Sequence, residues 1–234
     1  MHKKLAFTMI ELIIVLVVVS ILAVMAIPRL NRDRRVEAIN HILMMIRYTQ
    51  NLALHDDKHN ISDSRWQRAF WRFGINRCSD GGLYYYIGSD DSPISANRYN
   101  GSIDNGESAI DPSNGKYLNY QTFSKCSKSK FIPKSISPNI FITQRYGINK
   151  VKFKNCYIIN SSGNRVKSTS KHIGFDNFGR AMKSYTNSNQ PTYSGLLVNN
   201  CEIEFKFDSN SIAPFTIVVP KETGFAYLKE NSRL

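Results

Sequence analysis

A single carboxylate interrupts the most apolar stretch of the chain. Residues 7–28 read FTMIELIIVLVVVSILAVMAIP, and Ser20 is the only polar residue between Leu12 and Ile27. At about 1.5 Å of rise per residue, a helix of this length spans roughly 30 Å, the thickness of a bilayer core. Glu11 lies inside it, where a charge costs a few kcal/mol unless it is paired or reaches the interface. The pattern predicts a membrane-embedded helix in which Glu11 either lies among lipid headgroups or forms a functional ion pair.

Positive charge is concentrated in one window of a chain whose formal net charge is +13. Residues 112–175 hold ten Lys and two Arg but no Asp or Glu. In the strand-like segment 150–154, Lys alternates with Val151 and Phe153, which places the Lys side chains on one face. Such a stripe attracts polyanions, so it is a candidate DNA-binding surface; alternatively, these side chains face solvent or an acidic neighbour. The candidate DNA contacts are Lys125, Lys128, Lys130, Lys150, Lys152 and Lys154.

The chain contains four cysteines, and all of them lie beyond the apolar helix. An even number in an exported domain indicates two disulfides, for which three connectivities exist. We favour Cys78–Cys126 with Cys156–Cys201, because the second pair falls in two strand-like runs, but free buried thiols are the alternative. The spacing matches no zinc motif, so no metal site is expected.

The remaining residues predict no enzyme and no cofactor. The chain has no Gly-rich phosphate loop, no G-x-S-x-G motif and no grouped Ser, His and Asp. The segment 89–115 holds hard oxygen donors of the kind that calcium prefers, but their spacing does not match an EF-hand. These donors are Asp104, Asn105, Glu107 and Asp111.

The apolar stretch continues into an amphipathic segment. Val36, Ile39, Leu43, Ile46, Gln50 and Ala53 recur at helical spacing, and Gln50 alone breaks the apolar face. We expect one helix from near Phe7 to about His55, with a kink at Pro28. The first half packs in membrane or fibre, and the second half carries the domain.

This helix is preceded by Lys3, Lys4 and the small residue Ala6. Phe7 follows Ala6 directly, and Glu11 lies four residues after Phe7. This segment resembles the N-terminus of type IV prepilins and type II secretion pseudopilins. The resemblance implies that prepilin peptidase cleaves between Ala6 and Phe7 and methylates the new Phe7 amine. It also implies that Glu11 pairs with the Phe7 amine of a neighbouring subunit, which would neutralise a buried carboxylate. Most members of this family have Gly immediately before the cleavage site, whereas this chain has Ala6. We expect that Ala6 still permits cleavage, at a lower rate.

The rest of the chain predicts a β-rich domain. Strands are expected over residues 66–76, 83–87, 139–143, 149–159, 171–175, 201–207, 215–219 and 224–228, and a surface loop or insertion near 89–134. Three short segments narrow the resemblance to the GspH/FimT group of minor pseudopilins and pilins: Arg47–Leu54, Phe175–Arg180 and the hairpin Phe215–Leu228. The implied fold is α+β, with a long N-terminal helix followed by an antiparallel β-sandwich-like domain.

These patterns define four regions. They are a leader (1–6), a transmembrane helix (7–28), its amphipathic continuation (29–59) and a globular domain (60–234). Arg29, Arg32, Arg34 and Arg35 follow the apolar run, and the positive-inside rule alone would keep the domain in the cytoplasm. The cysteines and the resemblance favour a single-pass inner-membrane protein with a cytoplasmic N-terminus and a periplasmic domain.

The function that we expect is that of a minor pilin or pseudopilin subunit in a fibre for type II secretion, a type IV pilus or DNA uptake. Its expected partners are other pilin subunits, prepilin peptidase, the inner-membrane assembly platform and membrane lipid. The alternative is a DNA-binding minor pilin that serves as a receptor in natural transformation, with DNA as a further partner.

Overall fold

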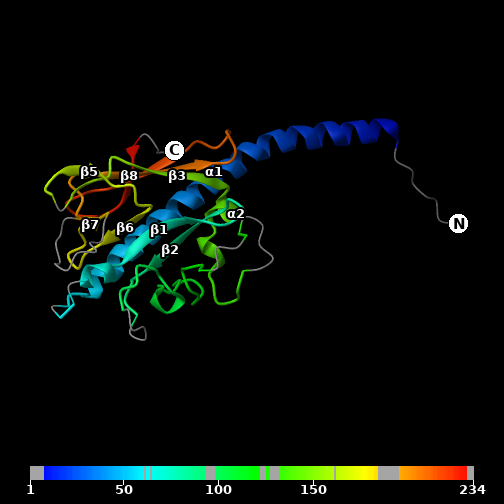
Figure 1. The fold of residues 1–234 in the computed structure, drawn as a ribbon. Helices are drawn as coiled ribbons and strands as arrows, with labels where there is room; N and C mark the ends of the chain where they lie inside the picture. The colour runs from blue at the N-terminus through cyan, green and yellow to red at the C-terminus, as the bar shows by residue number, and fades with distance from the viewer. Residues whose placement is uncertain are drawn as a thin grey trace.

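The computed structural model describes residues 8–60, 62–63, 65–92, 98–121, 125–126, 132–160, 162–183 and 195–230, with the backbone alone over 23–31. One long helix, α1 (Met9–His55), begins the fold, and its first half extends away from the domain (Figure 1). It is continuous through Pro28 and curves along its length. The predicted helix from near Phe7 to about His55 is therefore confirmed.

Two four-stranded antiparallel sheets follow the helix. The first has the order β2-β1-β6-β7, the second the order β10-β9-β8-β3, and β4 pairs with β5 in a small ribbon. The strands are β1 (Arg72–Arg77), β2 (Leu83–Gly88), β3 (Ile148–Lys154), β4 (Tyr157–Ile159), β5 (Arg165–Lys167), β6 (His172–Phe175), β7 (Ala181–Met182), β8 (Cys201–Phe207), β9 (Phe215–Val219) and β10 (Tyr227–Leu228). Short helices are η1 (Trp66–Ala69), η2 (Asn105–Glu107), η3 (Pro138–Ile140) and α2 (Ile142–Tyr146).

The second half of α1 shares one hydrophobic core with both sheets. Ile39, Ile42 and Ile46 are buried together with Phe73 of the first sheet and Phe205 of the second. Burial of this apolar face supplies most of the stability that a long amphipathic helix needs. The α+β class and the antiparallel sheets are confirmed, whereas the predicted sandwich is not, because α1 contributes to the core along with both sheets.

The strand predicted over residues 139–143 is wrong. Ser137 caps η3 by accepting a hydrogen bond from the Asn139 amide at 3.2 Å, and Pro138 occupies the first helical position. Gly147 then ends α2 with φ +70°. These residues are start and stop signals for helices, and they override the apolar run between them.

Three further predicted strands differ in extent, and the one expected over 224–228 is reduced to β10 (Tyr227–Leu228). Residues 66–69 form the short helix η1 instead of a strand. An Asx turn precedes this helix, in which the Asp63 side chain accepts a hydrogen bond from the Arg65 amide at 2.9 Å. The segment 149–159 is divided between β3 and β4, and Asn155 between them has φ +57°. Asn tolerates this left-handed conformation, which interrupts the extended backbone.

The segment near 89–134 was predicted to be a surface loop or insertion, and its described parts combine exposed stretches such as 112–115 with residues that pack into the domain. Asp90 and Leu118 are fully buried, and Tyr99, Ala109 and Tyr120 are nearly so. Ala109 and Ile87 are joined by a backbone hydrogen bond, so this segment extends the packing of the first sheet.

Candidate functional site

The N-terminus of α1 places Glu11 in a capping box. The Thr8 hydroxyl accepts a hydrogen bond from the Glu11 amide at 3.3 Å, and Glu11 Oε2 accepts from the Thr8 amide at 2.8 Å. The Thr8 hydroxyl also donates to Glu11 Oε2 at 2.9 Å. The sequence analysis identified Glu11 but missed this partner, although Thr followed three residues later by Glu is the signature of a capping box. Ala6 and Phe7 lie outside the described residues, so cleavage there and pairing of Glu11 with a Phe7 amine stay predictions.

The apolar side chains from Met9 to Leu22 are not covered by any described residue. From Met9 to Leu22, the large apolar side chains are 47–81% exposed. Ser20 satisfies its own hydroxyl by donating to the Leu16 carbonyl at 2.7 Å. Within the part of the chain that the structure describes, no helix combines the length and the apolar character needed to cross a membrane.

The predicted lysine stripe lies along β3 at one edge of the second sheet. Lys150 and Lys152 are exposed, whereas Val151 and Phe153 are half-buried, as the alternation predicted. Lys125 is also exposed, but the structure does not place it on this strand. Lys128 and Lys130 lie outside the described residues.

The neighbouring strand β8 neutralises part of this stripe. Lys154 Nζ lies 2.7 Å from Glu204 Oε1, and this contact lowers the pKa of Glu204. Lys229 pairs with Glu202 at 2.8 Å, so both carboxylates on this face of β8 are already in ion pairs. Lys150 and Lys152 form no ion pair with any described residue. The sequence could not anticipate this pairing, because the register of β3 against β8 joins residues about 50 positions apart.

A junction that the sequence analysis did not recognise forms around Gln50. This side chain is buried, and its Nε2 donates to the Gly179 carbonyl at 2.8 Å and to the Thr223 carbonyl at 2.7 Å. The three segments that carry the GspH/FimT resemblance therefore meet at one point: the helix, the turn after β6 and the hairpin after β9. Gln50 was noted as the residue that breaks an apolar face, and that break was the available signal.

Arg47, one turn earlier on α1, reinforces the same junction. Its Nε donates to the Ala226 carbonyl at 2.9 Å, and its guanidinium lies 4.2 Å from the centroid of the Phe225 ring. Phe225 is 53% exposed, so this contact is at the surface of the junction. We will call Arg47, Gln50, Gly179 and residues 223–226 the helix–hairpin junction.

Both favoured disulfides are present. Cys78 is bonded to Cys126 and Cys156 to Cys201, and among the described residues there is no free cysteine. The one group of potential metal ligands found in the described residues is Cys78, Asp80 and Cys126, in which both sulfurs are used by the disulfide.

Three of the four suggested calcium donors, Asp104, Glu107 and Asp111, form hydrogen bonds within the protein. Asp104 and Glu107 form a capping box at η2. Asp111 is almost fully buried, and it accepts hydrogen bonds from the side chains of Ser113, Ser137 and Asn139.

The comparisons with known proteins agree with the geometry at the start of α1. Residues 1–27 match the family model of the prokaryotic N-terminal methylation motif. No curated protein and no solved structure matches the chain. The motif supports a type IV pilin-like or pseudopilin subunit, and it implies other pilin subunits and prepilin peptidase as partners. Over its first 27 of 234 residues, therefore, the chain carries the prokaryotic N-terminal methylation motif, the type IV prepilin-like signal.

Proposed function

We propose that this protein is a minor pilin or pseudopilin subunit of the GspH/FimT group, assembled into a fibre at the inner membrane through α1. The observation that carries this proposal is the uncovered apolar surface from Met9 to Leu22, which projects beyond the domain (Figure 1). An apolar surface of this length requires lipid before assembly and neighbouring helices afterwards. The membrane and the fibre provide these two environments in turn, with the assembly platform transferring the subunit between them.

The two disulfides support the proposed topology. They persist in oxidising compartments, so the domain belongs on the periplasmic side and the leader on the cytoplasmic side. Prepilin peptidase would then meet the bond between Ala6 and Phe7 at the cytoplasmic face. The product would be a methylated Phe7 amine, four positions before Glu11 in the sequence.

Glu11 sets the register of the subunit in this proposal. In the single chain its Oε2 is held by Thr8, so the carboxylate has local partners before assembly. In a fibre, the Phe7 amine of a neighbour supplies the opposite charge that a carboxylate needs away from water. The capping box keeps the carboxylate positioned at the first turn of the helix until that partner arrives.

The test is Glu11→Ala in the host cell, with Ser20→Ala as the matched control. Both variants remove one exposed polar side chain from the same apolar segment of α1. We expect Glu11→Ala to reach the membrane fraction at the wild-type level but to be lost from the sheared fibre fraction, whereas Ser20→Ala enters both. Normal incorporation of Glu11→Ala into the fibre would exclude the proposed pairing.

DNA binding is a second candidate function, favoured by two exposed lysines of β3 that form no ion pair with a described residue. Lys150 and Lys152 lie on the same face of β3, and phosphate contacts from such a face depend little on sequence. Lys154 contributes less, because Glu204 already holds its ammonium group.

This candidate is tested with the full chain in detergent micelles and labelled double-stranded DNA. If both lysines contact phosphates, Lys150→Glu with Lys152→Glu reduces the slope of log K against log salt by about 2, since each contact contributes about 0.9. Lys221→Glu, an exposed position on the hairpin outside this strand, is the control and leaves the slope unchanged. A slope that is the same in the double variant and the wild type would exclude this face as the DNA contact.

A further inference from the structure

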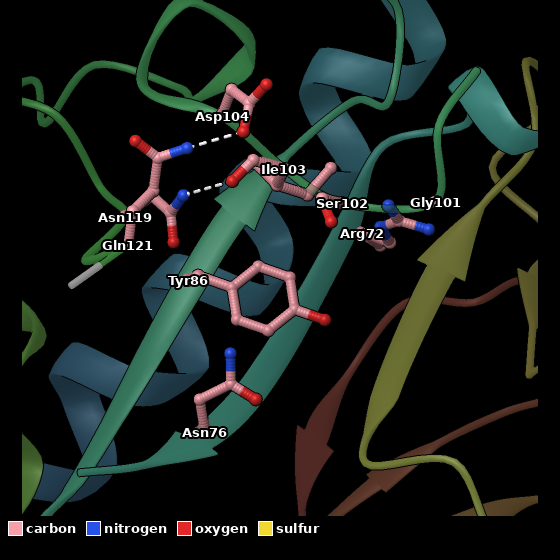
Figure 2. Close-up of a pocket in the computed structure, with 9 residues that line it drawn as sticks. All are labelled: Arg72, Asn76, Tyr86, Gly101, Ser102, Ile103, Asp104, Asn119 and Gln121. Carbon is pink, nitrogen blue, oxygen red and sulfur yellow. Dashed lines mark hydrogen bonds between the residues drawn. The ribbon is translucent and has the colours of Figure 1, made fainter. Parts of the chain in front are cut away.

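A pocket of about 470 Å³ lies on the face of the first sheet that is turned away from α1 (Figure 2). Tyr86 of β2 forms its floor, and its walls are formed by β1 and the segments 101–104 and 119–121. This volume is within the range of small-molecule sites in proteins. Neither the methylation motif nor the proposed fibre role uses this pocket.

A tyrosine ring forms the floor of the pocket because a glycine lies opposite it. Gly74 of β1 is paired in register with Tyr86 of β2, and a Cβ at Gly74 would overlap the Tyr86 ring. The absence of that Cβ allows the ring to lie across β1, as Figure 2 shows, with one face directed into the pocket. An aromatic face is an apolar platform, and the C–H groups of a sugar ring pack well on such a surface.

The walls around this platform carry amide groups. Asn76 of β1 and Gln121 both line the pocket, and Gln121 Nε2 donates to Asp104 Oδ1, so this amide is held in place. A side-chain amide offers two N–H donors and a carbonyl acceptor. Hydroxyl groups are also both donors and acceptors, and an amide can therefore bind a vicinal pair of them.

The charges near the pocket favour an uncharged ligand over an anionic one. Arg72 lines it, but its Nη2 lies 3.9 Å from Oδ2 of the fully buried Asp90. Asp104 also lines the pocket. The one guanidinium that lines the pocket therefore already lies near a buried carboxyl group, and Asp104 adds a carboxylate to the lining, which disfavours a phosphate or carboxylate ligand.

The wall of the pocket is fixed before any ligand arrives. Asp90 accepts hydrogen bonds from the amides of Asn100 at 3.0 Å and Gly101 at 2.8 Å. Asn119 Nδ2 donates to the Ile103 carbonyl at 2.5 Å, which fixes the other end of the same segment. A site that is already ordered loses little conformational entropy on binding.

We propose that this pocket binds an uncharged saccharide, with one sugar ring stacked on Tyr86 and its hydroxyl groups bound by Asn76 and Gln121. The ligand is a free monosaccharide or the terminal residue of a neutral glycan. The stacking and hydrogen bonds would be the same for the free sugar and for the end of a glycan, because in each case a single sugar ring lies on Tyr86.

The experiment is saturation-transfer NMR on the full chain in micelles of lauryldimethylamine oxide, a detergent without a sugar headgroup. The probes are glucose, galactose, mannose and N-acetylglucosamine, with glucuronic acid and glucose 6-phosphate as charged counterparts. We expect transfer to the ring protons of at least one neutral sugar and weaker transfer to the charged ones. Comparing N-acetylglucosamine with its β-1,4-linked trimer, each as the probe, distinguishes a free sugar from the end of a glycan.

Two rim variants test the assignment without changing the floor. Asn76→Ala and Gln121→Ala should each weaken binding by about 3–10-fold, the usual effect of one hydrogen bond. Asn149→Ala, an exposed position on β3, is the matched control and should bind as the wild type does. Tyr86→Phe keeps the ring and should retain binding. Three outcomes would overturn the proposal: no transfer to any neutral sugar, preference for the charged probes, or wild-type affinity in both rim variants.

Discussion

One added methyl group at Gly224 would test the helix–hairpin junction directly. Gly224 has φ +65°, and a Cβ built there would overlap the Gly179 carbonyl oxygen. It would also lie 2.9 Å from Gln50 Nε2 and 3.2 Å from Phe175 Cδ1. The first of these atoms belongs to the backbone of a tight turn, so it cannot move aside as a flexible side chain would. Gly224→Ala should therefore separate the hairpin from the helix.

The expected cost has two parts. Placing any L-residue in the left-handed region costs about 1–2 kcal/mol. Overpacking a filled site costs about 1–3 kcal/mol more. Gly224→Ala should thus lower the free energy of unfolding by about 2–5 kcal/mol. Gly115 isolates the first part, because its φ is +71° and an added methyl group would have no atom within 4 Å, so Gly115→Ala should cost only about 1–2 kcal/mol.

The assay is equilibrium urea unfolding of the full chain in micelles, followed by near-ultraviolet circular dichroism, which reports on the packed tyrosines of the domain. The quantity to compare is the difference between the two glycine variants, since the backbone cost is common to both. If Gly224→Ala and Gly115→Ala lowered the free energy of unfolding equally, the overlap between the added Cβ and the Gly179 carbonyl oxygen would contribute nothing to the cost. That result would refute the argument made from the Gly179 carbonyl.

Three further predictions concern stability and use the same unfolding assay. Gln50→Leu leaves the Gly179 and Thr223 carbonyls without their donor and should cost about 2–4 kcal/mol, whereas a cost below about 0.5 kcal/mol would contradict the role of Gln50. The disulfides close loops with sequence separations of 48 and 45 residues, so replacing either pair by Ala should cost about 4 kcal/mol and the two costs should be nearly equal; a clearly unequal pair would refute the chain-entropy argument. Burial lowers the pKa of Lys183 from 10.5 to about 7, so the unfolded chain binds more protons between these values; stability should rise from pH 7 toward pH 10, and Lys183→Met should remove that rise.

The sequence by itself determined the local features of the protein. Apolar spacing predicted α1, because a 3.6-residue period can be read without knowing what the helix packs against. Alternation predicted β3 and β8, and the processing motif is contiguous in the chain. The preferred disulfides were also correct, and in the second pair Cys201 of β8 is bonded to Cys156, which lies between β3 and β4.

Contacts between distant residues required the tertiary structure. The helix–hairpin junction joins Gln50 to residues 129 and 173 positions away, and nothing local in the sequence indicates those partners. The register of β3 against β8 decided which lysines are neutralised, and the pairing of Gly74 with Tyr86 created the pocket floor. Local periodicity fixes which face of an element is apolar, but the free energy of packing selects the partner of that face. For this reason the helix and its motif could be predicted from the sequence, whereas the junction and the pocket could not.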